Sequence, residues 1–176
     1  MKELAVIILN WNGRRLLEQF LPVASRYSIT EDADLIVADN GSTDDSVEWV
    51  KAHHPEVKVL SFSENYGFAE GYNKAIKQTQ YKYTILLNSD VEVTEDWTRP
   101  LLDFMRRNSD VGALQPKIRS WKERTKFEYA GAAGGYLDKL GYPYCRGRLF
   151  DSIEEDHGQY DGKVVDVCWA SGAALM

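Results

Sequence analysis

Short apolar runs alternate with longer amphipathic stretches through the first hundred residues, and this alternation most constrains the fold. The runs have the length and composition of buried strands and lie at residues 4–9, 35–38, 57–62 and 83–87. Helical spacing of apolar residues follows each run, at residues 14–27, 43–52, 68–79 and 96–107. Four strand–helix units in series predict an α/β fold with a mainly parallel sheet and helices on both faces.

Two details of the helices are also expected. Pro22 lies inside the first helical stretch and is expected to end or kink it, because proline has no backbone N–H. The apolar face of the third helix is expected to consist of six residues, namely Phe68, Ala69, Tyr72, Ala75, Ile76 and Thr79.

The pattern changes after Gly112, and the second part of the chain is less regular. Residues 111–118 and 163–170 have the composition of strands, whereas residues 123–161 are rich in glycine, tyrosine and charge. We therefore expect a mixed, loop-rich extension after the regular part. The whole chain, residues 1–176, is expected to form one domain with halves at 1–110 and 111–176.

Composition and charge narrow the class of protein. The formal net charge is −6 and no basic tract occurs, which argues against nucleic acid as a partner. The two cysteines, Cys145 and Cys168, are far apart and favour a reduced, cytoplasmic setting. No stretch approaches the roughly 20 apolar residues of a membrane span. Peripheral association with the inner face of a membrane is left open.

Polar residues follow all four predicted strands. In an open parallel sheet, ligands bind outside the carboxyl ends of the strands, so these segments are expected to meet at one edge. They are the stretches Asn10-Trp11-Asn12-Gly13, Asp39-Asn40-Gly41-Ser42-Thr43-Asp44, Ser63-Glu64-Asn65-Tyr66-Gly67 and Asn88-Ser89-Asp90-Val91-Glu92.

Two of these ends allow a functional and an ordinary interpretation. The Asp39 carboxylate can accept hydrogen bonds from a ribose or a base, or can simply form a turn with Asn40 and Gly41. Gly67 can let the backbone and a helix N-terminus approach a ligand, with amides from Asn65 and Asn73, or can belong to an ordinary loop.

The fourth end carries two acids. Asp90 and Glu92 are hard oxygen donors, and Mg²⁺ or Mn²⁺ usually takes one or two carboxylates together with water and substrate phosphates. If Asp90 lies beside Asp39, a metal–diphosphate site follows. The alternative is a strand that ends in solvent.

Taken together, four segments in this order resemble family 2 glycosyltransferases, most closely the rhamnosyltransferase-like members. The segments are VIILNWNG, DLIVADNGSTDDSVEWV, ENYGFAEGYNKAI and YTILLNSDVEV. The resemblance implies a GT-A fold, a UDP- or dTDP-linked sugar donor, and inverting transfer of a hexosyl or deoxyhexosyl group. It also implies a glycan or lipid-linked acceptor and a role in polysaccharide or glycoconjugate synthesis.

The resemblance also assigns roles to individual residues. Asp90 matches the usual metal ligand, for Mg²⁺ or Mn²⁺, and Asn88 stands where the family has its first acid. The implied nucleotide-sugar-binding residues are Asn10, Asn12, Asp39, Asn65, Gly67, Asn73, Asn88 and Ser89.

The catalytic base is expected beyond Met176, because in the family it follows a segment like SGAALM. The chain is therefore expected to be a C-terminally truncated domain that binds nucleotide and transfers little or no sugar. Two alternatives remain at this point. One is a nucleotidyltransferase that makes sugar nucleotides, although the NWNGRR loop has a single glycine; the other is a non-catalytic nucleotide-binding module.

Overall fold

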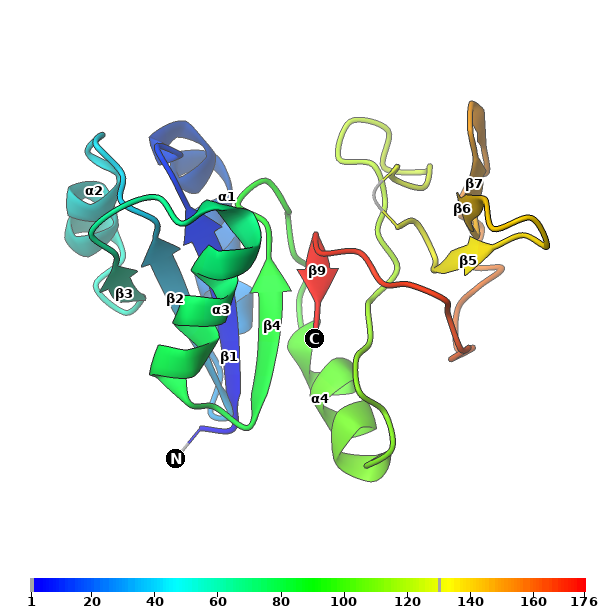
Figure 1. Ribbon diagram of the computed structural model, residues 1–176, viewed down its shortest axis with the longest axis horizontal. Coiled ribbons are helices and arrows are strands. Elements are labelled where there is room, and N and C mark those ends of the chain that lie inside the picture. Colours follow the sequence, from blue (N-terminus) through cyan, green and yellow to red (C-terminus); the bar gives the residue numbers. More distant parts are fainter. Residues whose placement is uncertain (1, 130) are drawn as a thin grey trace. The chain divides into compact units, whose positions relative to one another are not determined.

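The computed structural model describes residues 2–129 and 131–176. These residues form two compact units, and each is described by itself. The first contains residues 2–111 and Met176, and the second contains residues 112–175. Figure 1 shows the course of the chain through both. No helix among the described residues is long and apolar enough to cross a membrane.

The first unit contains a parallel sheet of the order β3-β2-β1-β4. Its strands are β1 (Leu4–Asn10), β2 (Ala33–Asp39), β3 (Lys58–Ser61) and β4 (Tyr83–Leu87). The chain runs outward from β1 through β2 to β3 and then returns to the other side of β1. This reversal makes a topological switch point between β1 and β4, where ligands of such sheets usually bind.

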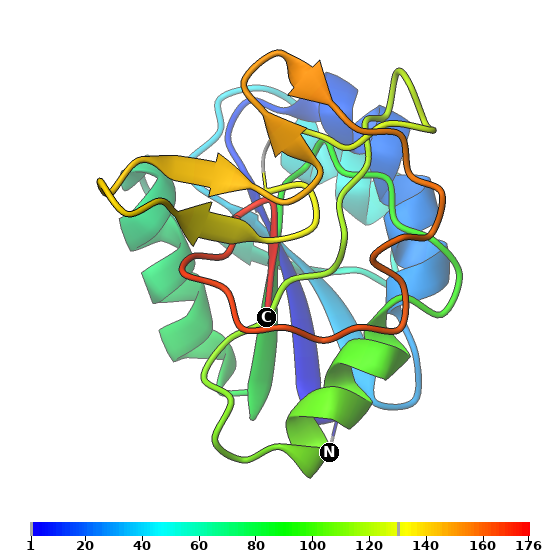
Figure 2. The same cartoon turned by 90° about the vertical axis from the view of Figure 1, so that its right-hand side faces the viewer.

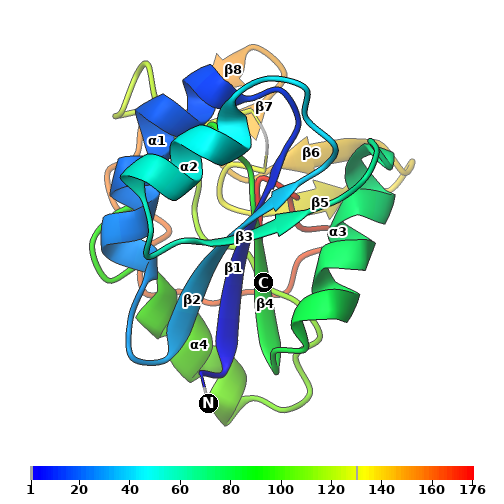
Figure 3. The ribbon, with the colours of Figure 1, turned by 90° about the vertical axis from the view of Figure 1, so that its left-hand side faces the viewer.

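Helices cover both faces of this sheet, as predicted. They are α1 (Arg14–Ser28), α2 (Ser46–His53), α3 (Gly67–Thr79) and α4 (Thr98–Arg107). Figure 3 shows α3 on one face and α1 and α2 on the other. Since β1 and β2 are covered on both sides, nearly all their residues are buried, which explains their uninterrupted apolar sequence. The α/β fold is thus confirmed.

Two helices differ most clearly from the prediction, and α4 also begins at Thr98 instead of Asp96. Helix α1 continues through Pro22. Pro22 is exposed, so water can hydrate the carbonyl of Glu18 that loses its N–H donor. Helix α2 begins at Ser46 instead of Thr43. The backbone N–H groups of residues 43 and 44 donate to Asn12 Oδ1, which holds them outside the helix.

The apolar face predicted for α3 was too broad. Phe68 and Ile76 are 58% and 38% exposed, and Ala69 is also exposed, whereas Tyr72 and Ala75 are buried. The helix packs on the sheet at Gly71, where an added Cβ would lie 3.0 Å from the Leu9 side chain. Because the helix lies so close to the sheet here, only one stripe of α3, formed by Gly71, Tyr72 and Ala75, is buried against it. The stripe joins a core cluster with Ala5, Ile7, Ile36 and Ala38.

The second unit is loop-rich, with short antiparallel strands in chain order (Figure 2). They are β5 (Gly135–Leu137), β6 (Pro143–Cys145), β7 (Arg148–Leu149) and β8 (Ser152–Ile153). Strand β9 (Ala174–Leu175) comes last in the chain and is not part of this four-stranded sheet. Phe127, Ala132 and Ala133 form its core cluster.

The strands predicted at residues 111–118 and 163–170 were wrong. In the first segment Pro116 has no N–H, and Ile118 N donates to Ala132 O at 2.8 Å in a loop contact. In the second segment Val164 is 72% exposed, and Trp169 forms only an isolated bridge with Gly135. Among the described residues neither segment pairs with a strand beyond the Trp169–Gly135 bridge, and apolar composition alone does not make a strand.

Candidate functional site

The site begins where β1 and β2 end side by side. Asn10 and Asp39 are partners in the parallel register, and Asn10 Nδ2 donates to Asp39 Oδ1 at 2.9 Å. The two residues are only 1% and 3% exposed. A hydrogen bond to a carboxylate shielded from water is stronger than one at the surface, so this pair holds the two strand ends together.

Ser42 completes the surroundings of the Asp39 carboxylate. Its hydroxyl donates to Oδ1 at 2.6 Å, and its backbone N–H donates to Oδ2 at 3.0 Å. Asn10 Nδ2 lies 3.2 Å from the same hydroxyl. Asp39 Oδ1 therefore has two donors and Oδ2 has one, which leaves Oδ2 with capacity for a further hydrogen bond.

A second acceptor in this cluster is unsatisfied. Asn10 Oδ1 is buried and has no hydrogen-bond partner within residues 2–129 and 131–176. A buried carbonyl without a donor costs free energy, and such groups are uncommon in folded proteins. Together with Asp39 Oδ2, it makes this end of the sheet rich in acceptors. The arrangement favours ligands with N–H or O–H donors.

Asn12 ties the loop after β1 to the loop after β2. Its backbone is in the left-handed region, with φ of 49°, and its N–H donates to the Ser42 hydroxyl at 2.9 Å. Its Oδ1 accepts from Thr43 N at 2.7 Å and from Asp44 N at 3.3 Å. The side-chain oxygen of Asn12 is thus used to shape the site.

Asp44 braces the same two loops. It accepts a hydrogen bond from the backbone N–H of Arg14 at 3.2 Å and from Ser46 N at 3.1 Å, and the Ser46 hydroxyl also bonds to it. Burial acts to raise the pKa of Asp44, but the hydrogen bonds from Ser46 and Arg14 outweigh it and lower the pKa. Asp44 is therefore an ionised structural group.

Asn40 joins the loop after β3 to this cluster. Its Nδ2 donates to Asn65 Oδ1 at 2.9 Å and to Gly67 O at 3.0 Å, and its Oδ1 accepts from Tyr66 N at 3.0 Å. Asn65 Oδ1 also accepts from Gly67 N at 2.7 Å. The oxygen of Asn65 is occupied, while its Nδ2 donates to no other described group.

The end of β4 is linked to β1 through Tyr72. The Tyr72 hydroxyl donates to Leu87 O at 3.0 Å and accepts from Leu9 N at 3.5 Å. Burial raises the pKa of Tyr72 to about 12, and the negative charge of Asp90 adds to this effect. The hydroxyl therefore stays protonated, and the Asp90 carboxylate lies within electrostatic reach of it.

The residues after β4 differ in exposure. Asn88 and Ser89 are half-buried, and Asp90 is exposed. Asp90 forms no ion pair or hydrogen bond with any other described residue. No group of three or more His, Cys, Asp or Glu residues in the described part of the chain could hold a metal ion. One free carboxylate fits a Mg²⁺ or Mn²⁺ ion that takes its other ligands from phosphates and water.

The predicted site residues thus fall into three sets. Asn10, Asn12 and Asp39 share one network through Ser42, and Asn65 and Gly67 are joined to it by Asn40. Asn88, Ser89 and Asp90 come directly after β4, the strand that the Tyr72 hydroxyl links to β1. Asn73 is exposed on α3 and bonds to none of them.

Sequence reasoning missed the roles of Asn40, Ser42 and Tyr72. Asn40 and Ser42 lie in the same polar run as Asp39, so their position was a usable signal. Tyr72 was predicted only as part of the apolar face of α3, and its ring does pack in the core. The sequence pattern did not indicate that its hydroxyl bonds to Leu87 O at the end of β4.

Two sequence comparisons bear on this geometry. The model of glycosyl transferase family 2 matches residues 5–163. Poly-beta-1,6-N-acetyl-D-glucosamine synthase from Staphylococcus epidermidis is 28% identical over 94 residues, a match covering 51% of this chain and 23% of that protein. The match therefore spans less than a quarter of the length of that relative.

Solved structures share the fold. TarS 1-349 of S. aureus in complex with UDP-GlcNAc gives a TM-score of 0.62 at 19% identity, covering 77% of this chain and 39% of that one. The mannosyltransferase PcManGT from Pyrobaculum calidifontis, in complex with GDP-Man and Mn²⁺, gives 0.55 at 22% identity, covering 66% and 36%. With the family model matching most of its length, this chain belongs to glycosyl transferase family 2 and has the GT-A type of α/β fold.

Proposed function

We propose that the chain binds a nucleotide-diphosphate sugar at the carboxyl ends of β1–β4, for inverting transfer of the sugar to a hydroxyl of a glycan or lipid-linked acceptor. The observation that carries this proposal is the acceptor-rich network of Asn10, Asp39 and Ser42 at the carboxyl ends of β1 and β2 in a family 2 fold. Polysaccharide synthesis is the named activity of a relative, and UDP-GlcNAc and GDP-Man are the ligands of two structural neighbours.

The nucleoside is assigned to the network around Asp39. Uracil and thymine each carry an imino N–H, and ribose carries hydroxyls, so either part can donate to Asp39 Oδ2. Asn65 Nδ2 supplies a donor for a carbonyl or ribose oxygen. The backbone at Gly67 and the N-terminus of α3 offer partial positive charge to phosphate. UDP- and dTDP-linked donors, which the sequence resemblance implies, are compatible with this network.

The diphosphate is assigned to the residues after β4. Asp90 would hold Mg²⁺ or Mn²⁺, which when bound stabilises the negative charge that develops on the leaving nucleoside diphosphate. Asn88 and Ser89 would hydrogen-bond ribose or phosphate oxygens. A single protein carboxylate leaves positions on the ion for both phosphates and water.

Calorimetry tests this assignment. UDP and dTDP are titrated with and without Mn²⁺ into the wild-type chain and into Asp39→Ala, Asp90→Ala and the control Asp110→Ala, whose side chain is exposed. Asp90→Ala should abolish the gain in affinity from Mn²⁺ and leave metal-free binding unchanged. Asp39→Ala should weaken binding about tenfold or more in both conditions, since it removes a hydrogen-bonding charged group. Binding that is indifferent to metal and to both changes would refute the site.

A further inference from the structure

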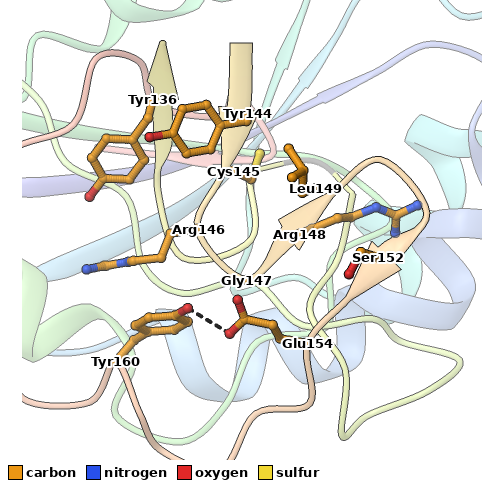
Figure 4. A pocket seen from close by; sticks show the side chains of 10 residues that line it. All are labelled: Tyr136, Tyr144, Cys145, Arg146, Gly147, Arg148, Leu149, Ser152, Glu154 and Tyr160. Atoms are coloured by element: carbon orange, nitrogen blue, oxygen red, sulfur yellow. Dashed lines mark hydrogen bonds between the residues drawn. The ribbon is translucent and has the colours of Figure 1, made fainter. Parts of the chain in front are cut away.

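The second unit contains a cavity of about 500 Å³ (Figure 4). All of its lining residues lie between Tyr136 and Tyr160, so the second unit alone forms it. Six of them carry the polar and aromatic groups used below: Tyr136, Tyr144, Arg146, Arg148, Glu154 and Tyr160. A volume of this size accommodates one or two sugar rings.

One wall of the cavity is aromatic. Tyr136 and Tyr144 are opposite each other across β5 and β6, and their rings stack with centroids 5.7 Å apart and planes 27° apart. Tyr144 is 38% exposed, and Figure 4 shows the two rings together at one side of the cavity. The pair therefore presents a flat apolar surface that is open to a ligand.

The other side combines a cation and an anion. The Tyr160 hydroxyl donates to Glu154 at 2.7 Å, and the Arg146 guanidinium lies 4.7 Å from the centroid of the Tyr160 ring. Burial raises the pKa of Tyr160 to about 12, and the bond to Glu154 contributes, so the hydroxyl remains a donor. Arg146 Nε donates to Ala133 O at 2.9 Å.

The remaining polar groups of these residues are available. Within the described parts of the chain, no carboxylate pairs with Arg146, and its two terminal nitrogens donate no hydrogen bond. Glu154 keeps acceptor capacity beyond its contacts with Tyr160 and Gln159. The cavity thus offers donors and acceptors beside an aromatic surface.

The floor of the cavity is packed into the core of the unit. Phe127 is fully buried, and its ring lies 5.5 Å from that of Tyr160. Gly147 lines the cavity, and an added Cβ there would come within 2.7 Å of the Phe127 ring. The polar groups around Tyr160 are therefore held by core packing and not by a loose loop.

We infer that this cavity binds a pyranose residue of a neutral glycan, stacked on Tyr144 and hydrogen-bonded by Arg146 and Glu154. A pyranose ring has an apolar C–H face and a rim of hydroxyls that both donate and accept, which matches an aromatic wall opposite a cation and an anion. Arg146 and Arg148 would attract an anionic group and Glu154 would repel it, so the lining does not single out an anionic ligand, and an acyl chain would strip these charges of water. That this glycan is the acceptor rests on the proposed function.

Nuclear magnetic resonance of the wild-type chain tests the inference directly. The probes are tetrasaccharides of β-1,4-linked glucose, α-1,4-linked glucose and β-1,4-linked N-acetylglucosamine at millimolar concentration. At least one of these tetrasaccharides should shift the ring resonances of Tyr136 and Tyr144. The resonances of Tyr142, which is 66% exposed and does not line the cavity, should stay unchanged. Absence of binding by all three, or shifts elsewhere only, overturns the inference.

Variants of Tyr144 separate stacking from folding. Tyr144→Phe keeps the ring and should retain the affinity, whereas Tyr144→Ala should weaken it about tenfold by removing the stacking surface. The control Tyr142→Ala removes an exposed neighbour and should bind as the wild type does. If Tyr144→Ala binds equally well, the stacked pose is wrong. If that variant fails to fold, the wild-type resonances decide.

The two sites are tested independently. Glycan binding should be unaffected by Asp90→Ala, and UDP binding should be unaffected by Tyr144→Ala. Glycan binding without UDP binding would refute the proposed donor site alone. UDP binding without glycan binding would refute this cavity as a sugar site alone.

Discussion

Asn10 and Asp39 stand side by side at the ends of neighbouring parallel strands, 2.9 Å apart and almost completely buried. The side-chain amide of Asn10 donates a hydrogen bond to the Asp39 carboxylate, and the two residues are separated by 29 positions along the chain. The carboxylate that we assign to the nucleoside is therefore held by the sheet itself. Loss of its partner should affect folding as well as binding.

Replacing Asn10 with alanine should destabilise the first unit. Asp39 would remain buried with one donor fewer, which typically costs about 1–3 kcal/mol. Urea unfolding followed by circular dichroism measures the change. Asn73→Ala is the matched control, because Asn73 is exposed and forms no hydrogen bond among the described residues. Equal stability of the two variants would contradict the role given to the Asn10–Asp39 pair.

Removing the Tyr72 hydroxyl tests the link between α3 and the strand ends. Tyr72→Phe keeps the buried ring but leaves Leu87 O without its side-chain donor, so we expect a loss of about 1–2 kcal/mol. Tyr83→Phe serves as control, since the Tyr83 hydroxyl makes no hydrogen bond with a described residue. Denaturant unfolding compares the two. A loss for Tyr83→Phe as large as that for Tyr72→Phe would show that the hydroxyl bond is unimportant.

Two glycines with nearly equal positive φ angles should respond differently to alanine. Gly41 and Gly67 have φ values of 73° and 74°, so each substitution costs about 1 kcal/mol of backbone strain. At Gly41 the new Cβ would also lie 2.5 Å from the backbone carbon of Glu64, whereas at Gly67 no atom lies within 4 Å. Thermal unfolding should therefore show a clearly larger loss for Gly41→Ala. Equal losses of stability for the two variants would mean that the loop after β3 moves away from the new Cβ at little cost.

Acid should remove a stabilising contribution from Asp34. Burial acts to raise the pKa of this carboxyl, but hydrogen bonds from Lys58, Tyr81 and Lys2 outweigh it and lower the pKa from 3.8 to about 2. The side chain is 15% exposed, and Lys58 Nζ lies 2.7 Å from it. Because the unfolded chain binds this proton more tightly, the contribution is complete above the unfolded pKa and disappears as the pH falls through about 2.

The size of this effect is about 2 kcal/mol at most. Urea unfolding between pH 6 and about pH 2 should show that Asp34→Asn has lost this part of the pH dependence. Asp110→Asn, at an exposed position without an ion pair among the described residues, should keep it. A wild-type profile that matches that of Asp34→Asn would contradict the assignment.

Much of the first unit could be predicted because its central strands β1 and β2 are buried on both faces. Such strands need continuous apolar sequence, and β4 at Tyr83–Leu87 was predicted with its correct ends. The helix boundaries were predicted less accurately than those of β4. The start of α2 depends on Asn12, which lies in another loop and captures the N–H groups of residues 43 and 44.

Most strands of the second unit could not be predicted from the sequence, for a physical reason. Strands β7 and β8 contain two residues each, too few to show any periodicity, and they exist only because they pair with neighbouring strands. Residues 111–118 and 163–170 are apolar enough for strands, but among the described residues they form no strand pairing beyond the single bridge at Trp169. Their prediction failed because strand formation depends on a neighbour and not on composition alone.

The sequence by itself determined the order of the strands and helices of the first unit, the polar character of every strand end, and the resemblance to a transferase family. These properties follow from local patterns of burial and from short motifs. Only the tertiary structure decided which polar groups satisfy one another. Asn10 donates a hydrogen bond to Asp39, Asn40 donates one to Asn65, and the Tyr72 hydroxyl donates one to Leu87 O. These contacts join residues far apart in the chain, because parallel strands bring their ends together only after the helices between them have packed.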